Sequence, residues 1–339
     1  MAARRRHKMY TYTVQNMANM ALAYKDPDAW FQADEIFVPQ MVNTIKGSYD
    51  VDDALAWFQN VDMHVGPDGY PTSMDIGNST VEWSTEPRGK NISINIADLK
   101  DYGSRNYTSA EQMKQVKWEL LIRTARINKE IAAVAQITTD GNYDAANRHV
   151  IGAGDFAASL AWSNANSRPI NDVDFLVREN SRANTIAMSW TTFRDLMINP
   201  QILDYGSITA ESRDNMTPKV SIRYLESCFN LRVVIFKSEA VTAATADLPI
   251  ASQVKGEIWG DYIWTGVVNK ASQGARMELP TWGHQYIYSP VTDNRGWIMT
   301  ETIDQRAGAG VGELKLDLGY YNQYKTYATS YGQRLNGVN

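Results

Sequence analysis

Histidine and cysteine residues are the first places to look for chemistry in this 339-residue chain. None of its four histidines has a second histidine, a cysteine or a paired carboxylate at the spacing of a metal site. They are His7, His64, His149 and His284. The single cysteine, Cys228, has no neighbour in the sequence that would activate its thiol, so we interpret it as a buried structural residue. These residues predict neither a metal site nor a thiol nucleophile.

A glycine-rich stretch at residues 307–313 (Ala-Gly-Ala-Gly-Val-Gly-Glu) superficially resembles a nucleotide-binding loop. Its glycines alternate with other residues and lie between two strand patterns, whereas a dinucleotide fingerprint follows a strand and opens a helix. The chain also lacks a G-x-S-x-G elbow and a phosphate loop. We therefore predict no catalytic residue, no cofactor and no enzymatic activity.

Aromatic residues near carboxylates leave one chemical alternative. Trp282 and Tyr286 lie close in sequence to Glu278, and Asp261 precedes them. Such residues occur in carbohydrate-binding and glycoside-cleaving proteins, which we keep as an alternative of a different class. A glycosidase needs two carboxylates at a defined separation across a cleft, and the sequence does not indicate that arrangement.

Composition favours an ordinary globular protein, with 44% hydrophobic and 21% charged residues. A net charge of −5 gives no overall attraction to nucleic acid or to an anionic membrane. No apolar run approaches the roughly 20 residues of a membrane span, and polar residues follow the basic start of the chain. We expect no membrane contact and a cytoplasmic site of synthesis and assembly.

The elements that would position functional residues begin with a long helix. Apolar residues recur at helical spacing between about residues 109 and 137, and this pattern predicts one continuous rod of roughly 40 Å. Thr108 or Ser109 would cap its start, with Glu111 or Gln112 completing a capping box. The apolar positions are Met113, Val116, Leu120, Ile127, Ile131 and Val134.

An extended arm is predicted before this helix, within residues 45–105. Ile92, Ile94 and Ile96 alternate with small or polar residues, which places three isoleucines on one face of a strand. Residues 80–83 would form the partner strand, joined through a turn at residues 86–89 (Glu-Pro-Arg-Gly). Because such a hairpin has little core of its own, we expect it to lie on another subunit.

The second half alternates strand and helix patterns. Residues 185–189 read as a strand, and Ser189 would cap a helix that ends before Pro200. Pro218 would open another helix, and further strands are expected at residues 231–236, 262–268, 285–288 and 297–302, with Leu314, Leu316 and Leu318 alternating in the tail. The predicted fold class is α+β.

This order of elements resembles the major capsid proteins of tailed bacteriophages of the Hong Kong ninety-seven type. The stretches that carry the likeness are 118–123 (Trp-Glu-Leu-Leu-Ile-Arg), 130–135 (Glu-Ile-Ala-Ala-Val-Ala), 184–193, 199–203, 229–235, 258–262 and 297–318. The resemblance covers roughly residues 60–320 and depends on element order and apolar pattern.

The resemblance implies five parts. These are an N-terminal arm (1–44), an extended loop formed by a β-hairpin (45–105), a peripheral domain with a spine helix at 109–137 (106–182), an axial domain (183–296), and C-terminal strands that return to the peripheral domain (297–339). It also implies self-assembly into hexamers and pentamers of an icosahedral shell around double-stranded DNA, located in the virion. An encapsulin-like nanocompartment shell is the alternative with the same fold.

The resemblance also suggests contact residues. For intersubunit contact we expect residues of the arm, namely Trp83, Arg88, Lys90, Ile92, Ile94 and Ile96. For packaged DNA or a scaffold protein we expect the basic start, namely Arg4, Arg5, Arg6 and Lys8, whose phosphate contacts would be independent of base sequence. The alternative for this start is a solvated terminus. Other expected partners are a separate scaffold, a portal and decoration proteins. Some family members crosslink a loop lysine to an asparagine, and Lys46 or Lys90 could occupy such a loop, but no motif identifies a partner.

Overall fold

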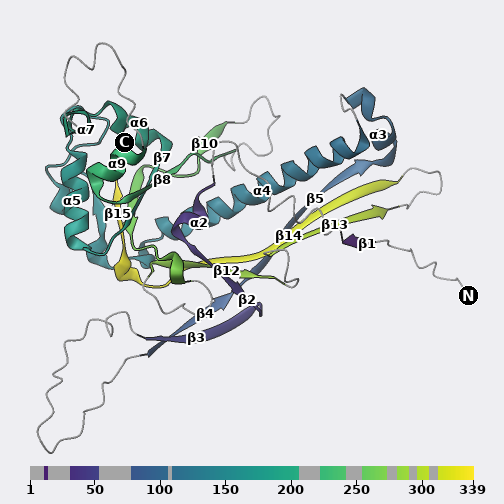
Figure 1. Ribbon diagram of the computed structural model, residues 1–339, viewed down its shortest axis with the longest axis horizontal. Helices are drawn as coiled ribbons and strands as arrows, with labels where there is room; N and C mark the ends of the chain where they lie inside the picture. The colour runs from purple at the N-terminus through teal and green to yellow at the C-terminus, as the bar shows by residue number, and fades with distance from the viewer. Residues whose placement is uncertain are drawn as a thin grey trace, which may run out of the picture.

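The computed structural model describes residues 11–13, 31–52, 78–105, 109–205, 222–241, 254–272, 281–289, 296–304 and 312–339. In these residues two β-sheets lie at different positions along one long helix (Figure 1). Helices surround the five-stranded sheet, whereas the six-stranded sheet is elongated and carries the long helix along one face. The mixed α+β class predicted from the sequence is confirmed.

The long helix α4 spans Ala110–Thr138 and therefore extends about 43 Å at 1.5 Å per residue. Its start is fixed by Ser109, whose side chain accepts a hydrogen bond from the backbone N–H of Gln112 at 3.1 Å. The predicted helix and its serine cap are confirmed.

The buried face of α4 differs from the predicted one. Met113 and Val134 are buried, but Val116, Leu120 and Ile131 are 41%, 51% and 43% exposed. The side chains that face the fold are Met113, Trp118, Leu121, Ile122, Ala125, Glu130, Ala133, Val134 and Ile137. The prediction of a single core stripe was wrong because α4 carries two apolar faces, and only one of them packs on the sheets.

The six-stranded sheet has the order β1-β13-β14-β12-β2, with β5 paired to β14 off this path. Its strands are β1 (Thr11–Thr13), β2 (Val38–Val42), β5 (Glu86–Asn95), β12 (Gly283–Tyr288), β13 (Trp297–Asp304) and β14 (Glu313–Thr326). The 14-residue strand β14 pairs with β5, β12 and β13, and its residues alternate between buried and more exposed along most of its length. This long strand is the centre of the sheet.

The five-stranded sheet has the order β6-β15-β11-β7-β8. Its strands are β6 (Arg148–Val150), β7 (Thr185–Ser189), β8 (Arg232–Phe236), β11 (Tyr262–Gly266) and β15 (Gly332–Asn336). The helices packed with it are α5 (Pro169–Glu179), α6 (Trp190–Ile198), α7 (Pro200–Tyr205) and α9 (Ile222–Phe229). Ser189 caps α6 as predicted, since its hydroxyl accepts the N–H of Thr192. The residues at 217–218, expected to open the following helix, lie outside the described residues.

The predicted hairpin partners were wrong. Strand β4 (Asn78–Ser84) pairs with β3 (Lys46–Asp52), and β5 pairs with the distant strand β14. The expected turn at residues 86–89 is instead part of β5, and Ile96 begins the short helix α3 (Ile96–Lys100). A two-stranded arm does exist, but β3 and β4 form it, and Figure 1 shows the pair pointing away from both sheets.

The domain boundaries expected from the sequence stay a prediction, and the strands of each sheet come from more than one of the expected parts. Strand β15, expected in the peripheral domain, pairs with β6 and β11 in the five-stranded sheet. Conversely, β2 and β12 lie in the six-stranded sheet, although the sequence placed them in the N-terminal arm and the axial domain. The chain passes between the two sheets several times, so linear boundaries do not separate them.

Three hydrophobic clusters hold the fold together. The first lies between the five-stranded sheet and its helices, and includes Leu176, Ile186 and Leu225. The second joins the other side of that sheet to the C-terminal half of α4 and to Trp282. The third joins the N-terminal half of α4 to β5, β13 and β14 around Trp118. Because α4 contributes to the second and third clusters, it connects the two sheets as a rigid strut.

Candidate assembly surfaces

The β3–β4 arm is fixed to the six-stranded sheet by the residues at its base. The indole of Trp83 stacks on the ring of Tyr286 in β12, with centroids 5.7 Å apart and planes 12° apart, and its Nε1 donates to the carbonyl of Thr44 at 3.3 Å. Gly47 lies directly opposite Trp83, where an added Cβ would come within 2.2 Å of the indole. A larger residue at this position would displace the tryptophan from its stack.

Strand β14 provides two further contacts to the base of the arm. The backbone N–H of Ser84 donates to the side-chain carbonyl of Gln323 at 2.7 Å, and Lys325 Nζ donates to the backbone carbonyl of Glu82 at 2.6 Å. Together with the aromatic stack, these bonds set the direction in which the arm leaves the sheet. The described contacts of Trp83 are therefore within its own chain, and they position the arm.

Strand β5 presents most of the other residues predicted for subunit contact. Arg88 and Lys90 are exposed, and Arg88 forms an ion pair with Glu86 at 3.2 Å. Ile92 is half-buried against the third cluster, and Ile94 is only 3% exposed within it. The side chain of Ile94 is buried within its own subunit, and the intersubunit contact expected of these residues stays a prediction. The alternation of isoleucines correctly indicated a strand with one buried face. That face packs against the third cluster of the same chain.

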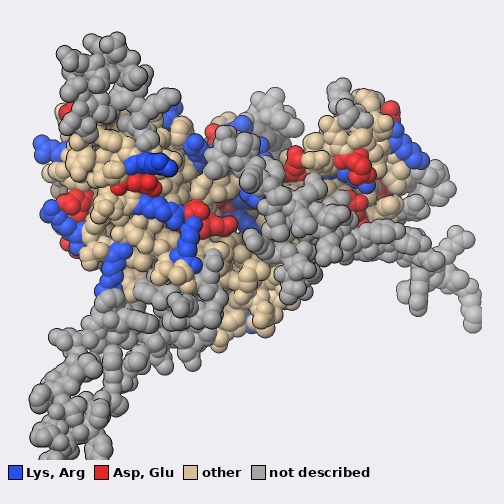
Figure 2. All heavy atoms as spheres, viewed as in Figure 1, with Lys and Arg blue, Asp and Glu red and all other residues tan. Residues whose placement is uncertain are grey.

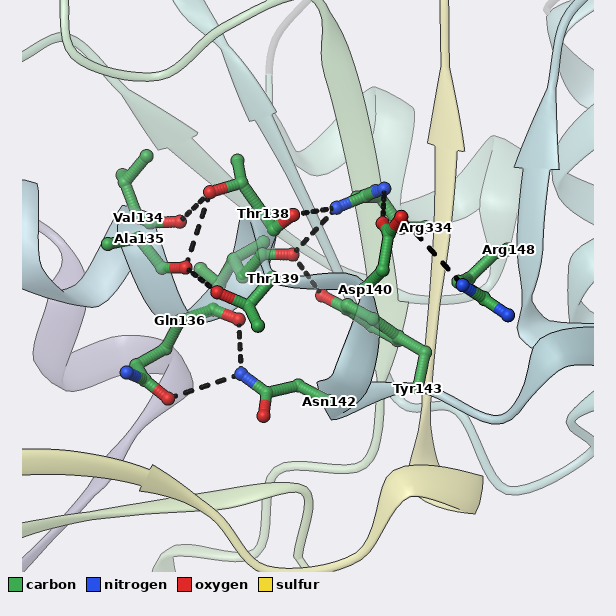
Figure 3. Close-up of polar contacts among 11 residues, drawn as sticks. Val134, Ala135, Gln136, Thr138, Thr139, Asp140, Asn142, Tyr143, Arg148 and Arg334 are labelled. Atoms are coloured by element: carbon green, nitrogen blue, oxygen red, sulfur yellow. Dashed lines mark hydrogen bonds and ion pairs between the residues drawn. The ribbon is translucent and has the colours of Figure 1, made fainter.

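The C-terminal end of α4 is held by Arg334 of β15 (Figure 3). Its guanidinium donates to the carbonyls of Ile137 and Thr138 and pairs with Asp140, which also faces Arg148 at 3.7 Å. A cation suits this position, since helix C-termini carry partial negative charge and unpaired carbonyls. This contact ties the strut to the five-stranded sheet.

Side chains just past the helix complete this cap. The hydroxyl of Tyr143 donates to the carbonyl of Ile137 at 2.7 Å, and the side-chain amide of Asn142 donates to the carbonyl of Gln136 at 2.7 Å (Figure 3). Nothing in the sequence pattern indicated Arg334, because it lies almost 200 residues beyond its partners.

A second junction is made by Glu130, in the C-terminal half of α4. Its carboxylate is 1% exposed and accepts the backbone N–H groups of Gln32 and Ala33 at 3.2 and 3.1 Å, at the start of the short helix α2 (Ala33–Ile36). Burial raises the pKa of Glu130 to about 8, although the two backbone hydrogen bonds oppose that shift. On the other side of α2, Glu35 pairs with Arg232 and Lys270 of the five-stranded-sheet region.

Glu130 predicts a dependence of stability on pH. A folded-state pKa of about 8, above the ordinary 4.5, means that its stabilising contribution is complete below pH 4.5 and is lost as pH rises through 8. The free energy of unfolding of the wild type should fall by roughly 3–5 kcal/mol over this range through this residue alone. Glu130→Gln keeps an acceptor and cannot ionise, so it should remove this part of the slope. Glu111→Gln, at an exposed position of the same helix, is the matched control. Equal slopes for wild type and Glu130→Gln in denaturant titrations would contradict the assignment.

The described residues contain no group of three or more histidine, cysteine or carboxylate side chains that could hold a metal ion. His149 and His284 are each buried among aromatic rings, and burial lowers the pKa of His284 to about 4. The carbohydrate-binding alternative loses the support of its aromatic residues, because Trp282 and Tyr286 are buried in the fold. No helix of the described residues has the length and hydropathy of a membrane span.

Surface charge is mixed on the face shown in Figure 2, where basic and acidic side chains of the described residues lie among a larger area of other residues. The basic residues Arg4, Arg5, Arg6 and Lys8 lie outside the described residues.

Among the solved structures that share this fold over most of the chain are a bacterial and a phage protein. A phage-related protein of Bordetella bronchiseptica RB50 is similar with a TM-score of 0.64 and 13% identity, over 97% of this chain and 98% of that chain. The capsid protein of the cyanophage P-SCSP1u is similar with a TM-score of 0.52 and 12% identity, over 88% of this chain and 86% of that chain. No protein-family model and no curated protein matches the sequence. The chain therefore has the fold of phage capsid proteins, with little identity in sequence.

Proposed function

We propose that this protein is the major capsid protein of a tailed bacteriophage of the Hong Kong ninety-seven type. In this role it self-assembles into hexamers and pentamers of an icosahedral shell that encloses double-stranded DNA. The observation that carries the proposal is the likeness in fold to a cyanophage capsid protein over 88% of this chain. The α4 strut and the projecting β3–β4 arm support it, since a shell subunit needs a stiff body and a part that reaches its neighbour.

The geometry of the arm supports the role that we propose for each part of the subunit. The base of β3 and β4 is held by Trp83, Gln323 and Lys325, so the arm leaves the subunit in a defined direction. We assign subunit contact to this arm and to the exposed Arg88 and Lys90 of β5. The basic start of the chain would meet packaged DNA or a scaffold protein. Portal and decoration proteins would be further partners, with assembly in the bacterial cytoplasm before the shell becomes part of the virion.

Electron microscopy and analytical ultracentrifugation of the purified protein test this proposal. We expect closed shells, or capsomer rings where a separate scaffold is needed. The contents of particles isolated from infected cells then separate a virion from an encapsulin-like compartment, because the first holds nuclease-protected DNA and the second holds protein cargo. A homogeneous monomer at high protein concentration, which binds sugar or remains inert, would reject a shell function.

A further inference from the structure

A polar cavity of about 180 Å³ lies between α4 and the six-stranded sheet. It lies beside the stretch of α4 that separates two hydrophobic clusters, since Ala125 belongs to the third cluster and Ala133 to the second. The wall formed by α4 includes Asn128, Lys129 and Gln136. Residues 128 and 136 are two helical turns apart, so they lie on one side of the helix. Polar side chains therefore replace apolar packing at this point of the strut.

The floor of the cavity is formed by strands β5 and β14. Arg88 faces Tyr320 and Glu86 faces Asn322 in the strand register, and all four side chains line the cavity. Arg88 and Glu86 are exposed and form an ion pair at 3.2 Å, so their charges offset each other. They lie at the mouth of the cavity, through which a solute can enter from the solvent.

Lys129 is the charged residue of this cavity that has no partner of opposite charge. Its half-buried ammonium lies 4.0 Å from the ring centroid of Trp297 and 4.9 Å from that of Tyr320. These rings hold the ammonium in place, but they carry no net charge. Within the described residues Lys129 forms no ion pair with a carboxylate. Burial lowers the pKa of Lys129 to about 8, although the charge of Asp34 opposes that shift. The lining of the cavity therefore has one positive charge in excess.

Two glutamine side chains add hydrogen-bond donors to the same cavity. The side-chain carbonyl of Gln323 accepts the backbone N–H of Ser84 at 2.7 Å, and that of Gln136 accepts the side-chain amide of Asn142 at 3.1 Å. These bonds occupy both carbonyl oxygens and fix which end of each amide is the donor. Each NH₂ group still has N–H donors to offer. A cation with amide donors around it is a lining that favours a negatively charged acceptor.

From these observations we infer that the cavity binds one small oxyanion of the phosphate class, with the ammonium of Lys129 as its counter-charge and the amides of Gln136 and Gln323 as donors. A water molecule occupies roughly 30 Å³ in the liquid, so a cavity of about 180 Å³ has room for such an ion together with some water. Water alone would fill the space but would leave the charge of Lys129 unpaired. The bound ion joins α4 to β14 between the two clusters and so stabilises the subunit.

Labelling of lysine amines with acetic anhydride at pH 8, measured by mass spectrometry, tests this site on the full-length unassembled subunit. Inorganic phosphate at ten times its dissociation constant should slow the acetylation of Lys129 roughly tenfold, because the bound ion keeps the amine protonated and covered. Sulfate should act in the same way. Lys100, an exposed residue of α3, is the internal control and should react at an unchanged rate. Sodium chloride at equal ionic strength should protect neither lysine.

Thermal unfolding gives a second measurement with matched variants. At the same concentration phosphate should raise the Tm of the wild type and of Lys100→Met by about 2 °C relative to chloride, and it should not raise that of Lys129→Met. If Lys129→Met does not fold, the labelling of the wild type decides.

Equal protection of Lys129 by phosphate and chloride, or none by either, would overturn the inference. Protection that appears only in assembled particles without phosphate would assign the cavity to a carboxylate of a neighbouring copy, and would overturn it as well. The measurements on the unassembled subunit do not require shells to form, so they stand apart from the proposed capsid function.

Discussion

Shortening the β3–β4 arm is expected to abolish closed shells and to leave the subunit folded. The variant joins Ser48 to Glu82 through an Asn-Gly turn and so removes residues 49–81. Ser48 and Glu82 face each other in the strand register, and a two-residue Asn-Gly turn closes such a hairpin without strain. The base contacts of Trp83, Ser84 and Lys325 are retained. The free energy of unfolding should therefore stay within about 1 kcal/mol of the wild type.

The yield of closed particles should fall at least about tenfold, since the arm is the part of the proposed subunit that reaches its neighbour. Size-exclusion chromatography and electron microscopy measure this yield, and circular dichroism checks the fold. A deletion of residues 60–95 is a useful contrast. It also removes β5, whose Ile94 is buried in the third cluster, so that variant should fail to fold. Normal shells from the short-arm variant would refute the role of the arm.

The sequence predicted α4 well because a helix is determined locally. Ser109 and Gln112 are three residues apart, and their hydrogen bond needs no distant partner. Ser189 and Thr192 repeat this at α6. The buried face of α4 could not be predicted in the same way, since Val116 and Leu120 follow helical spacing as regularly as the buried residues do. Only the position of the sheets decides which apolar face is covered, and that is a tertiary property.

The predicted pairing of the strands was the larger error, for a related reason. The alternation of Ile92 and Ile94 correctly indicated a strand with one buried face, but its partner, β14, lies more than 200 residues further along the chain. A nearby turn signal at residues 86–89 favoured a local hairpin, whereas the residues continue as one strand. Register between distant strands depends on the whole fold, which no local pattern contains.

The polar junctions also could not be predicted from the sequence. Glu130 occupies a buried position of α4 that would ordinarily be apolar, and only the two backbone N–H groups at the start of α2 explain it. The role of Arg334 similarly follows only from its position beside the C-terminal end of α4. In both cases a charged side chain joins elements that are distant in sequence, and these contacts make the strut continuous with both sheets.

Trp118 is the residue of this strut whose loss should cost the most stability. Its side chain is completely buried in the third cluster, and Nε1 donates to Glu301 of β13. Trp118→Ala removes a large apolar group, leaves a cavity between α4 and the six-stranded sheet, and takes away a hydrogen-bond donor of Glu301. The free energy of unfolding should fall by about 3–5 kcal/mol, as for other buried aromatic residues replaced by alanine.

Denaturant unfolding of the unassembled subunit measures this loss. Gln115→Ala, one turn earlier on the exposed side of α4, is the control and should change the free energy by no more than about 0.5 kcal/mol. Ligand or partner effects do not enter, because the cluster is internal to one chain. A loss below about 1 kcal/mol for Trp118→Ala would mean that the sheet does not need the N-terminal half of α4 for its stability. In that case α4 could not act as the strut that connects the two sheets.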